Sequence, residues 1–210
     1  MKMARTGGLH GFRRGLIVGV AASLLVMASG ASSVQGAANP CAVRTTTRPF
    51  IPWGDYNEYF PGPGGLFEVS SLPWMITGNA MTTFENEPWR INGATDMASL
   101  LIFPNSLAVS VPFCVQTKED AIRLFVKRPG FPGAALQVRV TALNLGQVAS
   151  NSVVIEGSSW GWKLSPRIAI PDLRDTNGDG QQIVFIEVFP INSQTSWQID
   201  DLMVDPIRTK

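Results

Sequence analysis

Histidine is almost absent from this 210-residue chain. The one histidine, His10, lies within an N-terminal segment that we expect to be removed. A chain without imidazole cannot use Ser-His-Asp or Cys-His catalysis, His-ligated zinc or copper, or an imidazole proton shuttle. Carboxylates, lysine, tyrosine and oxygen-ligated metals remain for any chemistry.

A long apolar run occurs near the N-terminus. Four basic residues precede the uncharged stretch Leu16–Met27, and small residues follow up to Ala38. This is the pattern of a cleavable secretory signal. The alternative is a transmembrane anchor, but a spanning helix needs about 20 apolar residues and this run is shorter. We therefore predict that residues 1–37 are a signal peptide, with cleavage frames ending at Gly36 and Ala38 both open. The mature protein is then secreted, extracellular or cell-wall associated, with no membrane association after cleavage.

Clusters of basic residues are also absent. Removing residues 1–37 takes away four of the 17 basic residues and none of the 16 acidic ones, which leaves a net charge of −3. The longest basic run in the remainder is Lys127-Arg128. Nucleic acids and anionic membrane surfaces are bound through concentrated positive charge, so the composition argues against both as partners.

Cysteine is scarce, with Cys41 and Cys114 as its two occurrences. Both follow the predicted signal, and an even count in an exported chain predicts one disulfide. The alternative, a catalytic thiol, needs a basic partner such as histidine, which the mature chain lacks.

Helical periodicity is scarce after residue 37, whereas strand patterns are common. Residues 121–127 and 136–141 alternate apolar and polar side chains, and the turn-forming residues 128–133 between them predict a hairpin. The apolar run Ile183–Phe189 predicts a central strand covered on both faces. The spacing of the remaining short runs is typical of an all-β fold. We therefore predict an antiparallel β-sandwich over residues 66–210, preceded by an irregular Pro/Gly-rich arm over residues 38–65.

Short motifs in the remainder resemble two families. They are Leu66-Phe-Glu68, Leu72-Pro-Trp74, Trp197-Gln-Ile-Asp-Asp-Leu-Met-Val204, Asn86-Glu-Pro88 and Gly93-Ala-Thr-Asp96-Met-Ala-Ser-Leu100. The first three resemble the jelly-roll, galactose-binding-like carbohydrate-binding modules of secreted bacterial proteins. The last two resemble a family of short, single-domain secreted proteins common in actinobacteria, which has no settled biochemical role. The resemblance implies a jelly-roll fold.

The same resemblance implies a structural calcium ion near Glu68, Asp200 and Asp201. On the last strand the apolar parity switches at the Asp pair, which predicts a β-bulge there. Calcium takes several oxygen ligands, including carboxylates. The alternative is that these carboxylates cap backbone amides or pair with arginine.

A second calcium candidate is the loop that contains Asp175, Asn177 and Asp179. It reproduces the first half of a calcium-binding loop, but the position of the closing acid falls on Ile186. Ordinary turn chemistry is the alternative for this loop.

Six tryptophans are many for a domain of this size. Exposed aromatic faces can stack on pyranose rings. The candidates for exposure lie among Gly, Pro, Asp and Asn, and they are Trp53, Tyr56, Tyr59, Trp89 and Trp160. Four of them, Trp53, Tyr56, Trp89 and Trp160, are the predicted ligand-binding residues. Trp74, Trp162 and Trp197 fall on strand patterns and are expected in the core. For each exposed candidate, the alternative is that it packs the arm onto the sandwich.

Paired carboxylates could support glycoside hydrolysis, and Glu85, Glu87 and Asp96 are spaced closely enough to be considered. Such spacing is frequent by chance, so we assign no catalytic residue. The leading hypothesis is a secreted, non-catalytic domain that binds cell-wall or environmental glycan. The alternatives are a structural or protein-interaction domain of the cell envelope and a small carboxylate-dependent carbohydrate-active enzyme.

Overall fold

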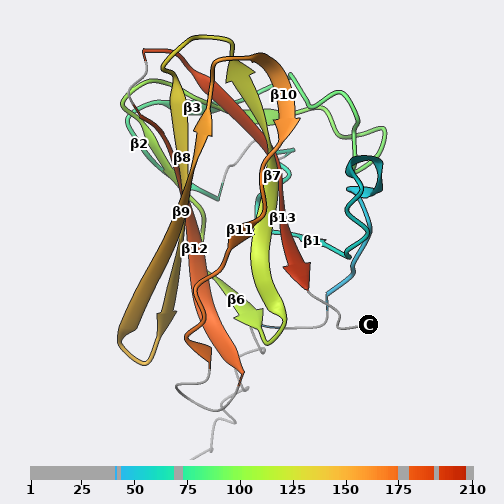
Figure 1. The fold of residues 1–210 in the computed structure, drawn as a ribbon, viewed down its shortest axis with the longest axis vertical. Coiled ribbons are helices and arrows are strands. Elements are labelled where there is room, and N and C mark those ends of the chain that lie inside the picture. The colour runs from blue at the N-terminus through green and yellow to red at the C-terminus, as the bar shows by residue number, and fades with distance from the viewer. Residues whose placement is uncertain (1–40, 42–43, 69–72, 175–179, 192–193, 207–210) are drawn as a thin grey trace, which may run out of the picture. The chain divides into compact units, whose positions relative to one another are not determined.

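The computed structural model describes residues 41, 44–68, 73–174, 180–191 and 194–206. These residues form two antiparallel β-sheets packed face to face, which confirms the predicted all-β sandwich (Figure 1). The predicted signal, residues 1–37, lies outside the described residues. None of the described helices is long and apolar enough to cross a membrane.

The seven-stranded sheet has the order β10-β7-β13-β4-β3, with β1 beside β13 and β11 beside β7. Its strands are β1 (Phe60–Pro61), β3 (Ala80–Thr83), β4 (Ser99–Ile102), β7 (Glu119–Pro129), β10 (Trp160–Leu164), β11 (Ile168–Ala169) and β13 (Trp197–Pro206). The six-stranded sheet has the order β2-β5-β12-β8-β9, with β6 beside β12. Its strands are β2 (Met75–Thr77), β5 (Leu107–Val109), β6 (Phe113–Gln116), β8 (Ala135–Asn144), β9 (Gln147–Glu156) and β12 (Gln181–Ile191). The chain passes repeatedly from one sheet to the other, as in a jelly roll.

Alternating apolar residues on the facing strands build the core. Val138 and Val140 of β8 are fully buried and contribute to the same apolar cluster as Leu124 and Val126 of β7. Successive side chains of a strand point to opposite faces, so this parity leaves the intervening polar residues on the outer faces of the sheets. Trp74 and Trp197 are buried in this core, as predicted, and Trp162 is half-buried.

The predicted hairpin between residues 121–127 and 136–141 is wrong. Both segments are strands, but β7 belongs to the seven-stranded sheet and β8 to the six-stranded sheet. The connection over residues 130–134 therefore crosses between the sheets. Gly130 and Gly133 have positive φ angles of 71° and 80°, which allow the sharp change of direction. Alternation identified the strands but carried no information about their partners.

The prediction that Ile183–Phe189 is covered on both faces is also wrong. β12 is central, because it pairs with β5, β6 and β8. Its burial nevertheless alternates along its whole length, with Val184, Ile186 and Val188 in the core and the intervening residues half-buried on the outer face.

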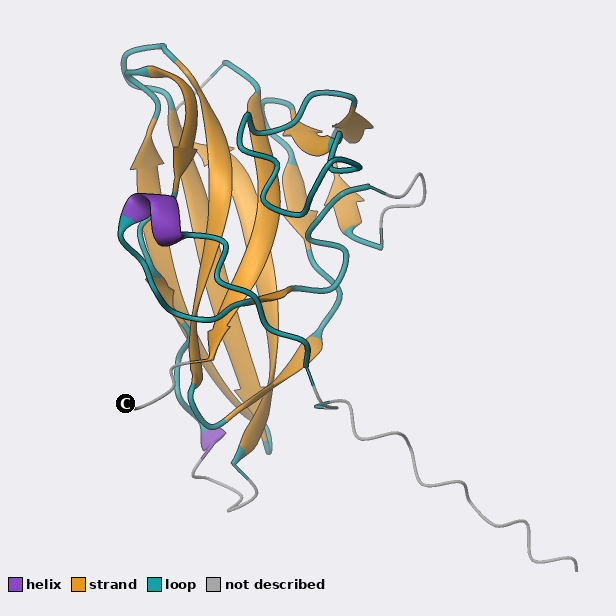
Figure 2. Ribbon diagram, turned by 90° about the vertical axis from the view of Figure 1, so that its right-hand side faces the viewer, coloured by secondary structure: helices purple, strands orange, loops and turns teal. Residues whose placement is uncertain are grey.

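The N-terminal arm lies across the outer face of the seven-stranded sheet, where Figure 2 shows its short 3₁₀ helix η1 (Ile51–Trp53) in purple. Phe50 and Tyr59 of the arm are fully buried with Phe125 of β7 and Met203 of β13. The Phe50 ring meets the Tyr59 ring edge-on, with 4.7 Å between centroids. Tyr59, expected to be exposed, is therefore a core residue of this second apolar cluster.

The arm is fixed to the sandwich near its start by the predicted disulfide between Cys41 and Cys114, whose Cα atoms lie 5.1 Å apart. The guanidinium of Arg44 pairs with Glu119 at 2.9 Å and lies 4.2 Å from the centre of the Phe60 ring. Covalent and ionic contacts thus hold the same part of the arm.

Replacing both Cys41 and Cys114 by serine should lower the free energy of unfolding by about 4 kcal/mol, because the disulfide closes a long loop and restricts the unfolded chain. Urea unfolding of the oxidised protein, the reduced protein and the double variant measures the difference. The reduced protein should match the double variant. Equal stability of all three would contradict a stabilising role for the disulfide.

Candidate functional site

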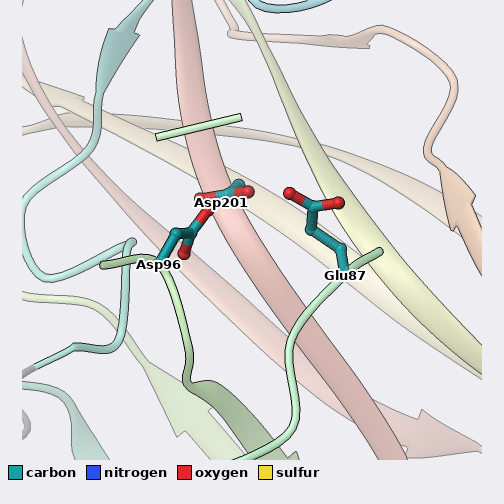
Figure 3. Close-up of side chains that lie close together, drawn as sticks. All are labelled: Glu87, Asp96 and Asp201. Carbon is teal, nitrogen blue, oxygen red and sulfur yellow. The ribbon is translucent and has the colours of Figure 1, made fainter. Parts of the chain in front are cut away.

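Four buried carboxylates meet beneath the loop that joins β3 to β4. Glu87 and Asp96 come from this loop, and Asp200 and Asp201 come from β13. None of the four is more than 1% exposed. Figure 3 shows the carboxylates of Glu87, Asp96 and Asp201 drawn together from the loop and the strand. These four residues are called the acid cluster.

A β-bulge places the two aspartates of β13. The ladder between β13 and β7 shifts register between Asp200 and Met203, and Asp201 has a φ of 49°. This confirms the bulge predicted from the switch in apolar parity. A bulge adds one residue to a strand and re-aims the side chains beside it. The bulge lets Ile199 and Leu202 both stay in the core while two consecutive carboxylates lie close to the loop.

Backbone amides satisfy part of the acid cluster. Glu87 accepts hydrogen bonds from the amides of Trp89 and Ile91, the latter at 2.8 Å. Asp200 accepts from the amide of Asp201 at 2.9 Å. Other oxygens lack a donor among the described groups, namely Oδ1 of Asp96, Oδ2 of Asp201 and Oδ1 of the neighbouring Asn86. The described part of the protein thus supplies hydrogen-bond donors to some oxygens of the acid cluster and not to others.

Burial raises the pKa of all four carboxyls. For Asp200 and Asp201 the shift is large, because the charges of the neighbouring carboxylates add to the cost of removing an ion from water. Among the described residues, no lysine or arginine forms an ion pair with the cluster to offset these charges.

The donor set of the acid cluster fits a hard cation. Carboxylate oxygens of Glu87, Asp96 and Asp201 all lie within 4.8 Å of one another. Oxygen-only ligands with several carboxylates are what Ca²⁺ prefers. The unpaired oxygens of Asp96 and Asp201 would gain a partner, and a cation would offset the buried negative charge.

The residues named from the sequence for this ion are partly brought together. Asp200 and Asp201 are in the acid cluster. Glu68 is exposed and accepts hydrogen bonds from the amides of Met97 and Ala98, both at 2.8 Å, as the amide-capping alternative predicts. Its carboxyl also interacts with that of Asp96 and helps to raise the Asp96 pKa, so it lies at the edge of the acid cluster. Sequence reasoning did not assign Glu87 and Asp96 to the ion, although both lie in the motifs that carried the family resemblance. Asp175, Asn177 and Asp179 lie outside the described residues.

A shallow groove on the outer face of the seven-stranded sheet is the second feature. Strand pairing aligns one outward row across the sheet, consisting of Met81, Leu101, Gln198, Lys127 and Trp162. The groove follows part of this row and has a volume of about 340 Å³. Its lining residues are Thr83, Glu85, Leu101, Lys127, Arg128, Pro129, Trp160, Ser196 and Gln198. It is called the Trp160 groove.

Trp160 forms one side of this groove and is 72% exposed. Its backbone pairs with Pro129 at the end of β7. Gly130 lies against it so closely that an added Cβ would come within 3.1 Å of the Trp160 Cβ. The Lys127 ammonium lies 5.5 Å from the centre of the indole ring and forms an ion pair with Glu85. The groove therefore combines an exposed aromatic face with charged and polar groups.

The other exposed aromatic candidates have different surroundings. Trp53 packs edge-on against Trp89, with 4.8 Å between ring centroids, and Trp89 stacks on Phe125 at 5.2 Å. These contacts agree with the alternative in which the aromatic residues pack the arm onto the sandwich, although Trp89 keeps 44% of its surface exposed. Tyr56 is 68% exposed on the arm. Of the four ligand-binding candidates, Trp160 is the one that lines the groove.

No protein-family model matches the sequence, and no curated protein matches it. Several solved carbohydrate-binding modules are similar in fold. TmCBM61, solved with β-1,4-galactotriose, is 16% identical over 70% of this chain and 95% of its own, with a TM-score of 0.43. The C-terminal family 22 module of Clostridium thermocellum Xyn10B is 12% identical over 70% of this chain and 97% of its own, with a TM-score of 0.39.

A xylan-binding family 22 module from Paenibacillus barcinonensis Xyn10C is 10% identical over 67% of this chain and 96% of its own, with a TM-score of 0.41. These β-sandwich modules are of the class that the short sequence motifs resemble. With TM-scores below 0.5, the likeness assigns no ligand and no site residue to this chain.

The acid cluster predicts that stability falls as the pH rises when no cation is bound. The folded protein has raised pKa values for Asp200 and Asp201, so it binds more protons than the unfolded chain. The stability that these two carboxyls contribute is complete at pH values below the pKa of an unfolded aspartate, near 4. It is lost as the pH rises toward their pKa values in the folded protein. In a chelating buffer, Tm should fall between about pH 5 and about pH 8, and it should fall less in Asp201→Asn. A Tm that rises over this range in the unmodified protein would contradict the prediction.

Proposed function

We propose that this chain is a secreted, non-catalytic glycan-binding domain whose binding site is the Trp160 groove. The observation that carries the proposal is an exposed indole beside the hydrogen-bonding side chains of Glu85, Lys127 and Gln198. A pyranose ring has an apolar face and a rim of hydroxyls, and this combination of groups complements both. Secretion rests on the signal-like sequence of residues 1–37.

The placement of the acids supports binding without turnover. Glycoside hydrolysis commonly uses two carboxyl groups about 5–10 Å apart on either side of the scissile bond. Among the described residues that line the groove, Glu85 is the one acid. Glu87 and Asp96, which were considered with it, are buried in the acid cluster and out of reach of a polymer in solvent.

We further propose that a structural Ca²⁺ occupies the acid cluster, held by Glu87, Asp96 and Asp201. The ion would link the β3–β4 loop to β13 by bonds to carboxylates from both. The proposal is supported by the all-oxygen donor set, its near-complete burial and the oxygens that lack donors. Its role here is structural, since the cluster is closed to a glycan.

Trp160→Ala should weaken glycan binding by at least about tenfold, because the loss of roughly 1.4 kcal/mol of stacking and apolar contact corresponds to that factor. Affinity electrophoresis against soluble polysaccharides, followed by calorimetry on the best ligand, measures the change. Tyr56→Ala removes an equally exposed aromatic side chain outside the groove and should bind as the unmodified protein does. Equal loss in both variants would contradict the groove, and failure of the unmodified protein to bind any polysaccharide or cell wall would refute the function.

Calcium should raise Tm by about 5–10 °C at a concentration a hundredfold above its Kd, since such occupancy adds roughly 2.7 kcal/mol. Asp201→Asn should abolish this response without unfolding the protein, because it also removes one buried charge. Glu156→Gln, a change at an exposed acid on β9, serves as the matched control and should keep the full shift. A Tm that is insensitive to calcium in the chelator-treated unmodified protein would refute the metal site.

A further inference from the structure

Glu85 is the most exposed of the charged residues that line the Trp160 groove. Glu85 and Lys127 form an ion pair, but their exposures differ, with 48% of the Glu85 side chain exposed and 17% of the Lys127 side chain. The Lys127 ammonium lies 5.5 Å from the centre of the indole ring. Within this ion pair, the Glu85 side chain is therefore the more accessible one to a ligand.

Gln198 holds the Glu85 carboxylate in place from the floor of the groove. Its side-chain amide nitrogen donates to Oε2 of Glu85 at 2.9 Å. This contact fixes the amide orientation, because the reverse orientation would set its oxygen against the carboxylate. The residue is 6% exposed, and its Oε1 has no donor among the described groups. Gln198 thus orients the Glu85 carboxylate, while its own acceptor oxygen is enclosed by the protein.

Arg128 is the remaining charged residue of the lining, and its position bears on ligand charge. It follows Lys127 on β7, and Lys127 belongs to the outward row. Successive side chains of a strand alternate between faces, so Arg128 has the opposite parity to Lys127. Its side chain is half-buried, and its Nε is enclosed without a partner among the described groups. Arg128 is thus less accessible than Glu85 to a ligand in the groove.

We propose that the Trp160 groove selects a neutral pyranose, whose hydroxyls donate to Glu85 while the ring stacks on Trp160, and that it discriminates against uronic acids. This inference rests on the proposed function. Hydroxyls supply donors to the Glu85 carboxylate, whereas a sugar carboxylate would bring a like charge to it. Hydrogen bonds from Lys127 and Gln198 lower the pKa of Glu85, which keeps it ionised at neutral pH.

Matched ligand pairs test the discrimination. Cello-oligosaccharides and β-1,4-galacto-oligosaccharides are compared with their derivatives oxidised to the carboxylate at C6, alongside a panel of native neutral and uronic-acid polysaccharides. We expect the neutral member of a binding pair to bind at least about tenfold more tightly at physiological ionic strength, with a smaller ratio in high salt, which screens charge. Glu85→Gln should bring the ratio close to one, and Glu156→Gln, a change at an exposed acid on β9 outside the groove, should leave it unchanged.

Two further results decide the assignment. Gln198→Met, checked for an unchanged Tm, should weaken binding of the neutral ligand severalfold. Equal or tighter binding of the oxidised ligands, or binding confined to native uronic-acid polymers, would overturn the selectivity while leaving glycan binding in place. Absence of binding to every polysaccharide would instead remove the proposed function on which the selectivity rests.

Discussion

The path of β13 through the middle of the seven-stranded sheet is the constraint on which the other features depend. This strand is buried along nearly its whole length, because the core covers one face and the arm and the β3–β4 loop cover the other. Its outward residues supply Gln198 to the Trp160 groove, Asp200 to the acid cluster and Met203 to the arm contact. A strand buried on both faces cannot slip by one residue without exchanging these partners, so its register fixes the groove, the acid cluster and the arm contact together.

The β3–β4 loop couples the acid cluster to the groove. Glu85 lies in the groove, and Glu87, two residues later, lies in the cluster. Between them Asn86 donates to the carbonyl of Asp96 at 3.2 Å, which closes the loop on itself. The backbone that positions Glu85 is thus held by contacts made inside the cluster, and any partner that compensates the buried carboxylates also stabilises the wall of the groove.

The sequence was sufficient for the strands from β7 to β13, the bulge and the disulfide, because each depends on local alternation or on a count of two cysteines. It did not identify the shorter strands β1 to β6. It was insufficient for the connection between β7 and β8, since a Pro/Gly-rich segment can turn within a sheet or cross between sheets. It was also insufficient for the aromatic residues. Trp53, Tyr59 and Trp160 share a polar, Gly-rich context, and their burial depends on whether the folded arm reaches them. Glu87 carries no local mark of burial, because the strand beneath it, β13, is more than a hundred residues away in the sequence.

The buried carboxylates require compensation that the described side chains do not provide. Protons can supply it, and the raised pKa values of Asp200 and Asp201 show that the fold favours the protonated forms. Protons neutralise the acids one at a time and leave the loop and the strand joined by weak contacts. A divalent cation would compensate the charge of several carboxylates together, and it would be coordinated by the oxygens of Asp96 and Asp201 that lack hydrogen-bond donors. Because those oxygens come from separate parts of the chain, a cation would also cross-link the β3–β4 loop to β13. This link would lie at the centre of the sheet, where displacement of β13 would disturb the core, the arm and the groove together.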